Sequence, residues 1–190
     1  MELRKKLLTL VLVALALAVV NASVFTYYPL SITLTPQKPP LIFKYGSNTK
    51  KPDLYGETIT ADIGPANTSL SLTVHPTYQK TYYKDIAEIK NQDSSNSYYV
   101  AIRVNTPFSG PTEAELLVFS GSTNVAAVDL LSTGTTAWLG PIPANGVWSI
   151  DLKVVILEKT GDSSSSAPSI SQPTASVQLI YSPQNTESPP

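Results

Sequence analysis

The chain has 190 residues, enough for one domain with extensions, and it has no cysteine, which excludes a disulfide framework. Charged residues make up 14% of the sequence and hydrophobic residues 42%, which excludes a chain that is disordered through low hydrophobicity. The net charge is −1 and the sequence has no polybasic patch, so a nucleic-acid partner is not expected. The 16 prolines are typical of an all-β protein with many turns.

The first 22 residues have the pattern of a signal peptide. Arg4, Lys5 and Lys6 precede an apolar run at residues 7–20, and Ala22 follows at a position that suits a signal peptidase. The run has 14 residues, fewer than the roughly 20 that span a bilayer, so cleavage after Ala22 is favoured over a retained anchor. We therefore expect a secreted or cell-surface protein with no stable membrane anchor after cleavage. Its mature chain loses three basic residues and one acidic residue, which leaves a net charge of about −3.

Residues 23–40 are predicted to form an extended N-terminal strand followed by a proline-rich linker. Large apolar side chains share one face of this strand, and Ser and Thr take the other face. The apolar row consists of Tyr28, Leu30, Ile32 and Leu34. Two interpretations stay open, because the strand can complete the sheet of its own domain or that of the next subunit. The second arrangement is donor-strand complementation, and it grows a head-to-tail homopolymer.

Residues 41–181 are predicted to form one antiparallel β-sandwich of jelly-roll type, and residues 182–190 a flexible tail. About ten short stretches alternate between apolar and polar residues, and turn residues separate them at the spacing of a sandwich. In the longest stretch, residues 147–157, the even-numbered side chains are expected to face the core. The expected strands are residues 41–45, 58–63, 69–74, 82–90, 98–104, 113–119, 125–131, 135–139, 147–157 and 175–181.

Two pairs of these strands are predicted to be hairpins. Residues 82–104 contain two alternating arms around the Asn, Asp and Ser residues at 91–97, which favour a turn. Residues 113–131 contain a second pair of arms around a turn at Gly121. A flexible linker is expected at residues 161–166, where one Gly and one Asp precede four serines.

The sequence contains no pattern of a catalytic or metal-binding site, so we predict neither an enzyme nor a cofactor. Its single histidine, His75, is expected to cap backbone groups at a turn. The tyrosine doublets at 27–28, 82–83 and 98–99 are each expected to bury one ring and to leave the other at a surface. Together with Trp138 and Trp148 they leave open an alternative function, a monomeric secreted or cell-surface binding module, for which carbohydrates are one ligand class. Asn67 begins the chain's one sequon in the mature region and is a candidate for N-glycosylation.

Several stretches of the chain resemble crenarchaeal surface-filament subunits. These are the thread and archaeal bundling-pilus proteins, which are similar in fold to the bacterial biofilm matrix fibre protein. The stretches that carry the resemblance are the alternating strand that ends at Leu34-Thr35-Pro36, the sequence Pro-Pro-Leu-Ile-Phe at residues 39–43, residues 56–59 with the following Gly64, and the sequence His-Pro-Thr-Tyr-Gln-Lys-Thr-Tyr-Tyr-Lys-Asp at residues 75–85.

The resemblance implies a jelly-roll-like subunit of an extracellular archaeal filament that supports adhesion or biofilm formation. It implies export by the general secretory route and polymerisation through a donor strand, here Leu30, Ile32 and Leu34, with Tyr28 included. The partners would be further copies of the chain, neighbouring filaments and cell-surface glycans. Some relatives are thickly glycosylated, whereas Asn67 is the one mature sequon here. A type IV pilin would instead keep its hydrophobic helix and be cut before it.

Overall fold

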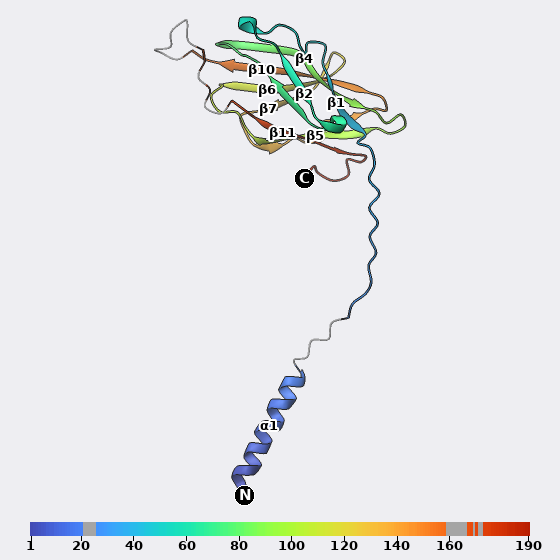
Figure 1. Ribbon diagram of the computed structural model, residues 1–190, viewed down its shortest axis with the longest axis vertical. Coiled ribbons are helices and arrows are strands. Elements are labelled where there is room, and N and C mark those ends of the chain that lie inside the picture. Colours follow the sequence, from blue (N-terminus) through green and yellow to red (C-terminus); the bar gives the residue numbers. More distant parts are fainter. Residues whose placement is uncertain (21–25, 159–166, 169, 171–172) are drawn as a thin grey trace. The chain divides into compact units, whose positions relative to one another are not determined.

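The computed structural model describes residues 1–20, 26–158, 167–168, 170 and 173–190. The chain divides into two compact units, Met1–Gln37 and Lys38–Pro190, and each is described by itself. Antiparallel β-strands dominate the structure, which is consistent with the predicted all-β fold (Figure 1).

The first unit contains the helix α1, Glu2–Val20, and residues 26–37, which carry no helix or strand. The predicted cleavage after Ala22 falls at residues 21–25, outside the described residues. Among the helices that the structure describes, none combines the length and the apolar character that crossing a membrane requires.

The second unit is built from eleven described strands and two short 3-10 helices. The helices are η1, Leu54–Gly56, and η2, Pro65–Asn67. The strands are β1 (Leu41–Tyr45), β2 (Thr60–Ile63), β3 (Leu70–Thr73), β4 (Gln79–Asn91), β5 (Tyr98–Thr106), β6 (Glu113–Ser120), β7 (Thr123–Asp129), β8 (Gly134–Thr135), β9 (Pro141–Ile142), β10 (Val147–Ile156) and β11 (Ser176–Ser182).

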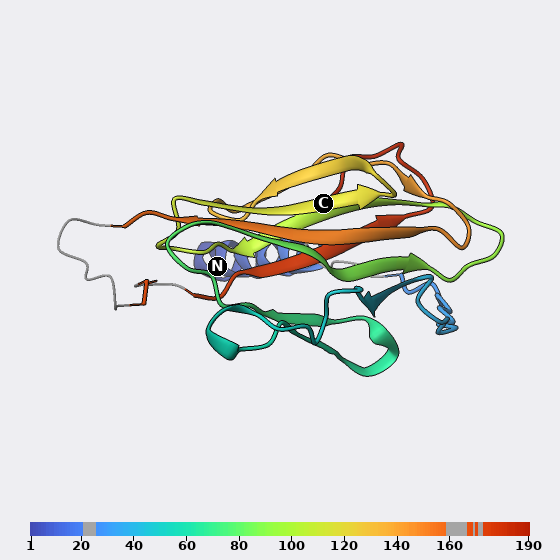
Figure 2. The ribbon, with the colours of Figure 1, turned by 90° about the horizontal axis from the view of Figure 1, so that it is seen from above.

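These strands form three sheets, in which all described pairings are antiparallel. The largest sheet has the order β1-β4-β10-β6-β7. A second sheet has the order β11-β5-β8, with β9 also paired to β5. The third sheet is the β2–β3 hairpin, which is drawn apart from the larger sheets in Figure 2.

One hydrophobic cluster joins the inner faces of the sheets. The even-numbered residues of β10 from Trp148 to Ile156 are each at most 5% exposed, which confirms the predicted core face of this strand. On β5, Val100, Ile102 and Val104 belong to the same cluster, as their alternation predicts. The period-2 pattern therefore identifies the buried face of both strands.

The predicted hairpin at residues 82–104 is wrong. Both arms are strands, but β4 pairs with β1 and β10, whereas β5 pairs with β11, β8 and β9. The turn between them leads the chain from one sheet to another. Asn91, which is fully buried, stabilises this crossing because its side-chain amide donates to the carbonyls of Asn96, Ile142 and Pro143. The second predicted hairpin, β6–β7, is confirmed.

A buried carboxylate stabilises the irregular middle of β4 and β10. The register of this pair shifts between Ile150 and Leu152, and Asp85 opposite has a φ of 45°. Asp151, which is 3% exposed, accepts the backbone N–H of Asp85 and the hydroxyl of Tyr82, each at 2.6 Å. Burial, aided by the bond to Asp151, raises the pKa of Tyr82 to about 12.

Two predicted boundaries differ from the structure. The stretch 135–139 was expected to be a strand, but only β8 at its start is one. No strand was expected at residues 140–146, but this region contains β9, whose Ile142 is fully buried beside Tyr98 of β5. The expected linker at residues 161–166 lies outside the described residues.

Candidate functional site

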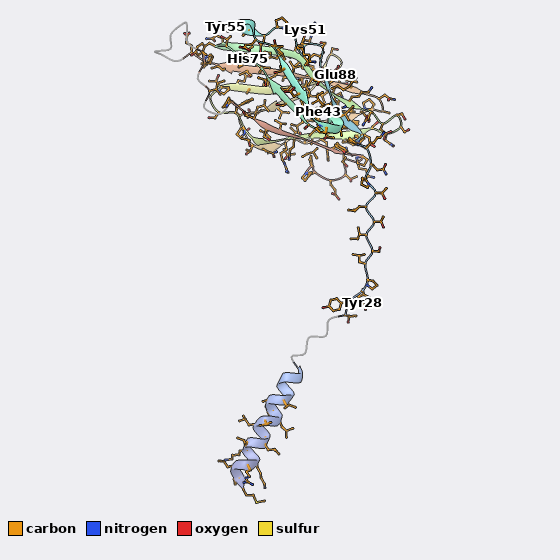
Figure 3. All side chains as sticks on the ribbon, in the orientation of Figure 1. Tyr28, Phe43, Lys51, Tyr55, His75 and Glu88 are labelled. Atoms are coloured by element: carbon orange, nitrogen blue, oxygen red, sulfur yellow. The ribbon has the colours of Figure 1, made fainter. Side chains whose placement is uncertain are left out.

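An apolar groove of about 480 Å³ is open in the Lys38–Pro190 unit. Its floor consists of inward-facing residues of the five-stranded sheet, among them Ile150, Leu152 and Val154 of β10. Phe43 of β1, labelled in Figure 3, and Ile102 of β5 also line it. The volume is roughly three times that of the 150 Å³ apolar cavity that an engineered protein keeps dry. The groove is therefore a gap in the core that is large enough for several side chains.

Strands β3 and β11 border this groove with their edges. From the floor strand β10, only alternate residues line the groove, as expected of a strand that presents one face. From the β3 region, by contrast, the five consecutive residues 70–74 line it, and Val177, Gln178 and Leu179 of β11 do the same. Consecutive residues point to opposite faces of a strand, so a strand that lines a groove with all of them presents its backbone edge.

The groove-side edges of β3 and β11 carry no ladder partner in the part of the chain that the structure describes. β3 pairs with β2 alone, and β11 is the terminal strand of its sheet. Unpaired strand edges are templates for a further strand.

The core-facing side chains on the groove walls are incompletely covered. Val177 of β11 is 38% exposed, whereas Val104, its register partner on β5, is 3% exposed. Leu70 and Leu72 of β3 are half-buried, although both pack against the hydrophobic cluster. These walls have the composition of a core but lack the neighbour that would bury them.

The predicted donor residues lie in the first unit. Their large apolar side chains are exposed by 74% to 85%, and no strand pairing is assigned to residues 26–37. Such a row of exposed apolar side chains is unusual for a stable surface. The residues concerned are Tyr28, which is labelled in Figure 3, Leu30, Ile32 and Leu34.

The His75 side chain contacts carboxylates, whereas the sequence predicted contacts with backbone groups at a turn. Its Nδ1 lies 3.0 Å from Asp53 Oδ2, which also accepts the His75 backbone N–H, and its Nε2 lies 3.9 Å from a Glu57 carboxylate oxygen. The Asp53 side chain is 3% exposed. This contact joins the loop that carries Tyr55 to the end of β3. Figure 3 labels Tyr55 and His75 in this part of the domain. The sequence did not reveal the pair, because its members are 22 residues apart.

A buried tyrosine lies beside the same loop. Tyr83 is 4% exposed, and its buried hydroxyl lies near the Asp53 carboxylate. Burial, followed by the nearby negative charge of Asp53, raises the pKa of Tyr83 above its usual value of 10. Tyr82, next to it, is 47% exposed, so the prediction of one buried ring and one exposed ring is confirmed for this doublet. It is wrong for Tyr27 and Tyr28, which are both exposed.

The two tryptophans do not form a shared surface. Trp148 is 3% exposed and belongs to the core. Trp138 donates its indole N–H to the backbone carbonyl of Glu187 at 2.6 Å, so this donor is already hydrogen-bonded to the C-terminal part of the chain. A sugar platform that uses both rings, as the sequence allowed, is therefore wrong.

Asn67 lies in an exposed turn at the end of η2, and two residues separate it from β3. It has a left-handed backbone with a φ of 57°, which asparagine adopts more readily than most residues. The side chain is therefore accessible to a modifying enzyme. Its modification stays a prediction.

In the described residues, no three His, Cys, Asp or Glu side chains are grouped in a way that could hold a metal ion. The groove walls and floor provide apolar surface and backbone edges, an arrangement that can bind an extended chain. No family model and no curated protein matches this chain.

Proposed function

We propose that the protein is a structural subunit of an extracellular filament, of the kind that the crenarchaeal resemblance indicates, and that it supports adhesion or biofilm formation. In this proposal residues 1–22 are a signal peptide, and the domain is a jelly-roll-like β-sandwich. The N-terminal segment of each subunit enters the apolar groove of the next subunit. The single observation that carries the proposal is this groove, which leaves the core of one chain incomplete.

The chemistry of the segment matches that of the groove. Leu30, Ile32 and Leu34 are spaced two residues apart, as are Ile150, Leu152 and Val154 on the floor. Side chains with this spacing are about 6.6 Å apart along any strand, so the two rows can interdigitate along their length. The groove and the exposed segment thus supply two complementary halves of one hydrophobic contact.

The free energies of burial and association predict a stable contact between subunits only when hydrogen bonds contribute as well. Burial of three large apolar side chains stabilises by about 1.5 to 3 kcal/mol each, as an upper estimate. Association costs an estimated 4 to 15 kcal/mol in lost translational and rotational freedom. Ladder hydrogen bonds add about 0.5 to 1.5 kcal/mol each, and a strand of this length can make several. A filament held without disulfides therefore depends on both apolar burial and strand pairing, because the chain has no cysteine.

Electron microscopy of the mature chain, residues 23–190, tests the proposal. We expect filaments from this chain and folded monomers from residues 41–190, which lack the donor segment. Ile32→Asp should prevent filament growth because it places a charge against the apolar floor. The matched control is Thr33→Asp, which adds the same charge on the other face of the strand and should leave filaments intact.

Monomers from the intact mature chain at all concentrations would contradict the proposal. Filaments that survive Ile32→Asp as well as they survive Thr33→Asp would contradict the role of the donor strand. In the first case a monomeric surface binding module becomes the leading interpretation, and glycan binding is the measurement to make next.

A further inference from the structure

The C-terminal residues of the chain lie against the segment that follows β8. The indole N–H of Trp138 donates to the backbone carbonyl of Glu187 at 2.6 Å, and the Thr135 hydroxyl lies 3.4 Å from the carbonyl of Pro190. A pocket of about 390 Å³ is lined by both segments, through residues 135–138 and 185–189. Among the described residues, it shares no lining residue with the apolar groove. The pocket is therefore a separate candidate site.

The wall that carries Trp138 is held to β5 by hydrogen bonds on both sides of this residue. Thr136 donates its backbone N–H to the carbonyl of Ile102 at 2.9 Å, and its hydroxyl accepts the Ile102 N–H at 3.0 Å. The backbone N–H of Leu139 donates to the carbonyl of Val100 at 2.8 Å. The bond from the indole to the C-terminal segment fixes the ring itself. The ring is therefore held in place before a ligand arrives, which lowers the entropy that binding loses.

The pocket combines one aromatic ring with hydroxyl and amide groups. Because the indole N–H is already bonded, Trp138 contributes apolar ring surface to the pocket. The side chains of Asn185, Thr186 and Ser188 contribute groups that can both donate and accept hydrogen bonds. A pyranose sugar has the matching chemistry, since it carries C–H groups on a ring face and hydroxyls around its rim. The volume lies near the lower end of the roughly 300 to 1,000 Å³ of ligand pockets, which suits a small saccharide.

The charge of the pocket narrows the class of saccharide. Among the described residues that line it, Glu187 alone is charged. A carboxylate repels a second negative charge, so uronic acids and sulfated sugars fit this pocket less well than neutral sugars.

We propose that this pocket binds a neutral mono- or disaccharide, with a sugar ring stacked on Trp138 and its hydroxyls bonded to polar groups of residues 185–188. This inference goes beyond the proposed function and does not depend on filament formation. It uses Trp138 alone, since Trp148 belongs to the core. The C-terminal segment then has a function, because it supplies one wall of the pocket and holds the ring that forms the other.

The chain has two tryptophans, so fluorescence can report on this pocket alone. In the Trp148→Phe variant, Trp138 is the single tryptophan that emits. The exported protein with this substitution would be titrated with maltose, cellobiose and mannobiose as neutral probes and with glucuronic acid as the acidic probe. We expect a saturable change in Trp138 emission with at least one neutral disaccharide, and binding of glucuronic acid at least about tenfold weaker. Calorimetry of the unsubstituted protein measures the same binding without the substitution.

Substitutions in the two walls locate the binding. Trp138→Ala should weaken it by about tenfold, since the stacking surface is lost. Thr186→Ala, in the exposed C-terminal segment, should weaken it less and does not disturb the bonds to β5. The control is Thr123→Ala, an exposed threonine of β7, which should have no effect.

The absence of saturable binding for every neutral probe, by calorimetry as well as fluorescence, would overturn the proposal. Binding that is unchanged by both Trp138→Ala and Thr186→Ala would overturn it too, because the saccharide would then bind elsewhere. Tighter binding of glucuronic acid than of the neutral probes would contradict the proposed ligand class. Since binding can be measured on monomers and on filaments alike, none of these outcomes depends on whether the chain polymerises.

Discussion

The strands β10 and β11 have similar alternating sequences but very different surroundings. β10 lies between β4 and β6, and its inward side chains are at most 5% exposed. β11 has one described partner, β5, and its core-facing Val177 is 38% exposed. Alternation therefore marks a face that can be buried, while burial itself depends on the neighbours that cover that face.

Truncation of a core side chain should lower the stability of the fold more in β10, which is paired on both sides, than in β11. Trp148→Ala in β10 removes a fully packed aromatic side chain and should lower the free energy of unfolding by about 3 to 5 kcal/mol. Chemical denaturation of the Ile32→Asp chain, which is expected to be monomeric, measures this loss. Trp148→Phe is the control and should have a smaller effect. A loss below 1 kcal/mol for Trp148→Ala would contradict the assignment of this ring to the core.

The polar network between β4 and β10 provides a second way to test the completed sheet. Asp151→Ala leaves the Asp85 N–H and the Tyr82 hydroxyl without their acceptor, which should destabilise the fold by about 1 to 3 kcal/mol. Tyr82→Phe removes only one of these bonds and should cost about 0.5 to 1.5 kcal/mol. Equal effects of the two variants, measured by urea denaturation, would show that the bond to the Asp85 backbone contributes nothing.

On the incomplete side, the same kind of truncation should act mainly on assembly. Leu72→Ala removes a half-buried side chain from the groove wall, so it should lower monomer stability by only about 1 kcal/mol. In the proposed filament that side chain would be buried against the donor, and a further loss of about 1.4 kcal/mol would raise the critical concentration tenfold. Sedimentation of filaments at several protein concentrations measures this change. Ser71→Ala, on the outer face, is the control, and an equal shift for both variants would contradict the account.

The smallest expected effect concerns the turn between β4 and β5. The side-chain amide of Asn96, the backbone N–H of Ser95 and the Tyr98 hydroxyl lower the pKa of Asp93 from 3.8 to about 2. A depressed pKa contributes stability at pH values above 3.8 and loses it as the pH falls toward 2. Asp93→Asn should therefore flatten the fall in stability between pH 4 and pH 2. An acid titration of thermal unfolding checks this, and parallel curves for the two proteins would contradict it.

The sequence predicted which faces are buried but not which strands are neighbours. Alternation places Trp148, Ile150 and Val100 on inward faces, because the side-chain period of a strand is independent of its partner. The pairing of β4 with β5 was wrong, because a turn at residues 92–97 can join two sheets as well as two neighbours in one sheet. β9 was missed because a strand of two residues, one of them proline, has no period to detect.

The candidate site has two parts, the N-terminal segment and the groove, and only the segment could be identified from the sequence. The row formed by Leu30, Ile32 and Leu34 is local and could be identified by its period. The groove is assembled from β3, β10 and β11, and its volume depends on their distances in space. The contact between Asp53 and His75 likewise joins residues that are far apart in the chain, so no local sequence pattern indicates it.

A thermal unfolding titration with the donor segment as a free peptide measures whether the groove binds this strand. The protein is the mature chain with Ile32→Asp, whose own donor strand is disabled, and the peptide comprises residues 27–36. We predict that the unfolding temperature rises with peptide concentration, by the equivalent of about 2.7 kcal/mol at a hundred times the dissociation constant. A peptide that carries Ile32→Asp should have no effect. An unfolding temperature that does not change with the wild-type peptide would contradict the claim that this groove accepts the N-terminal strand of another subunit.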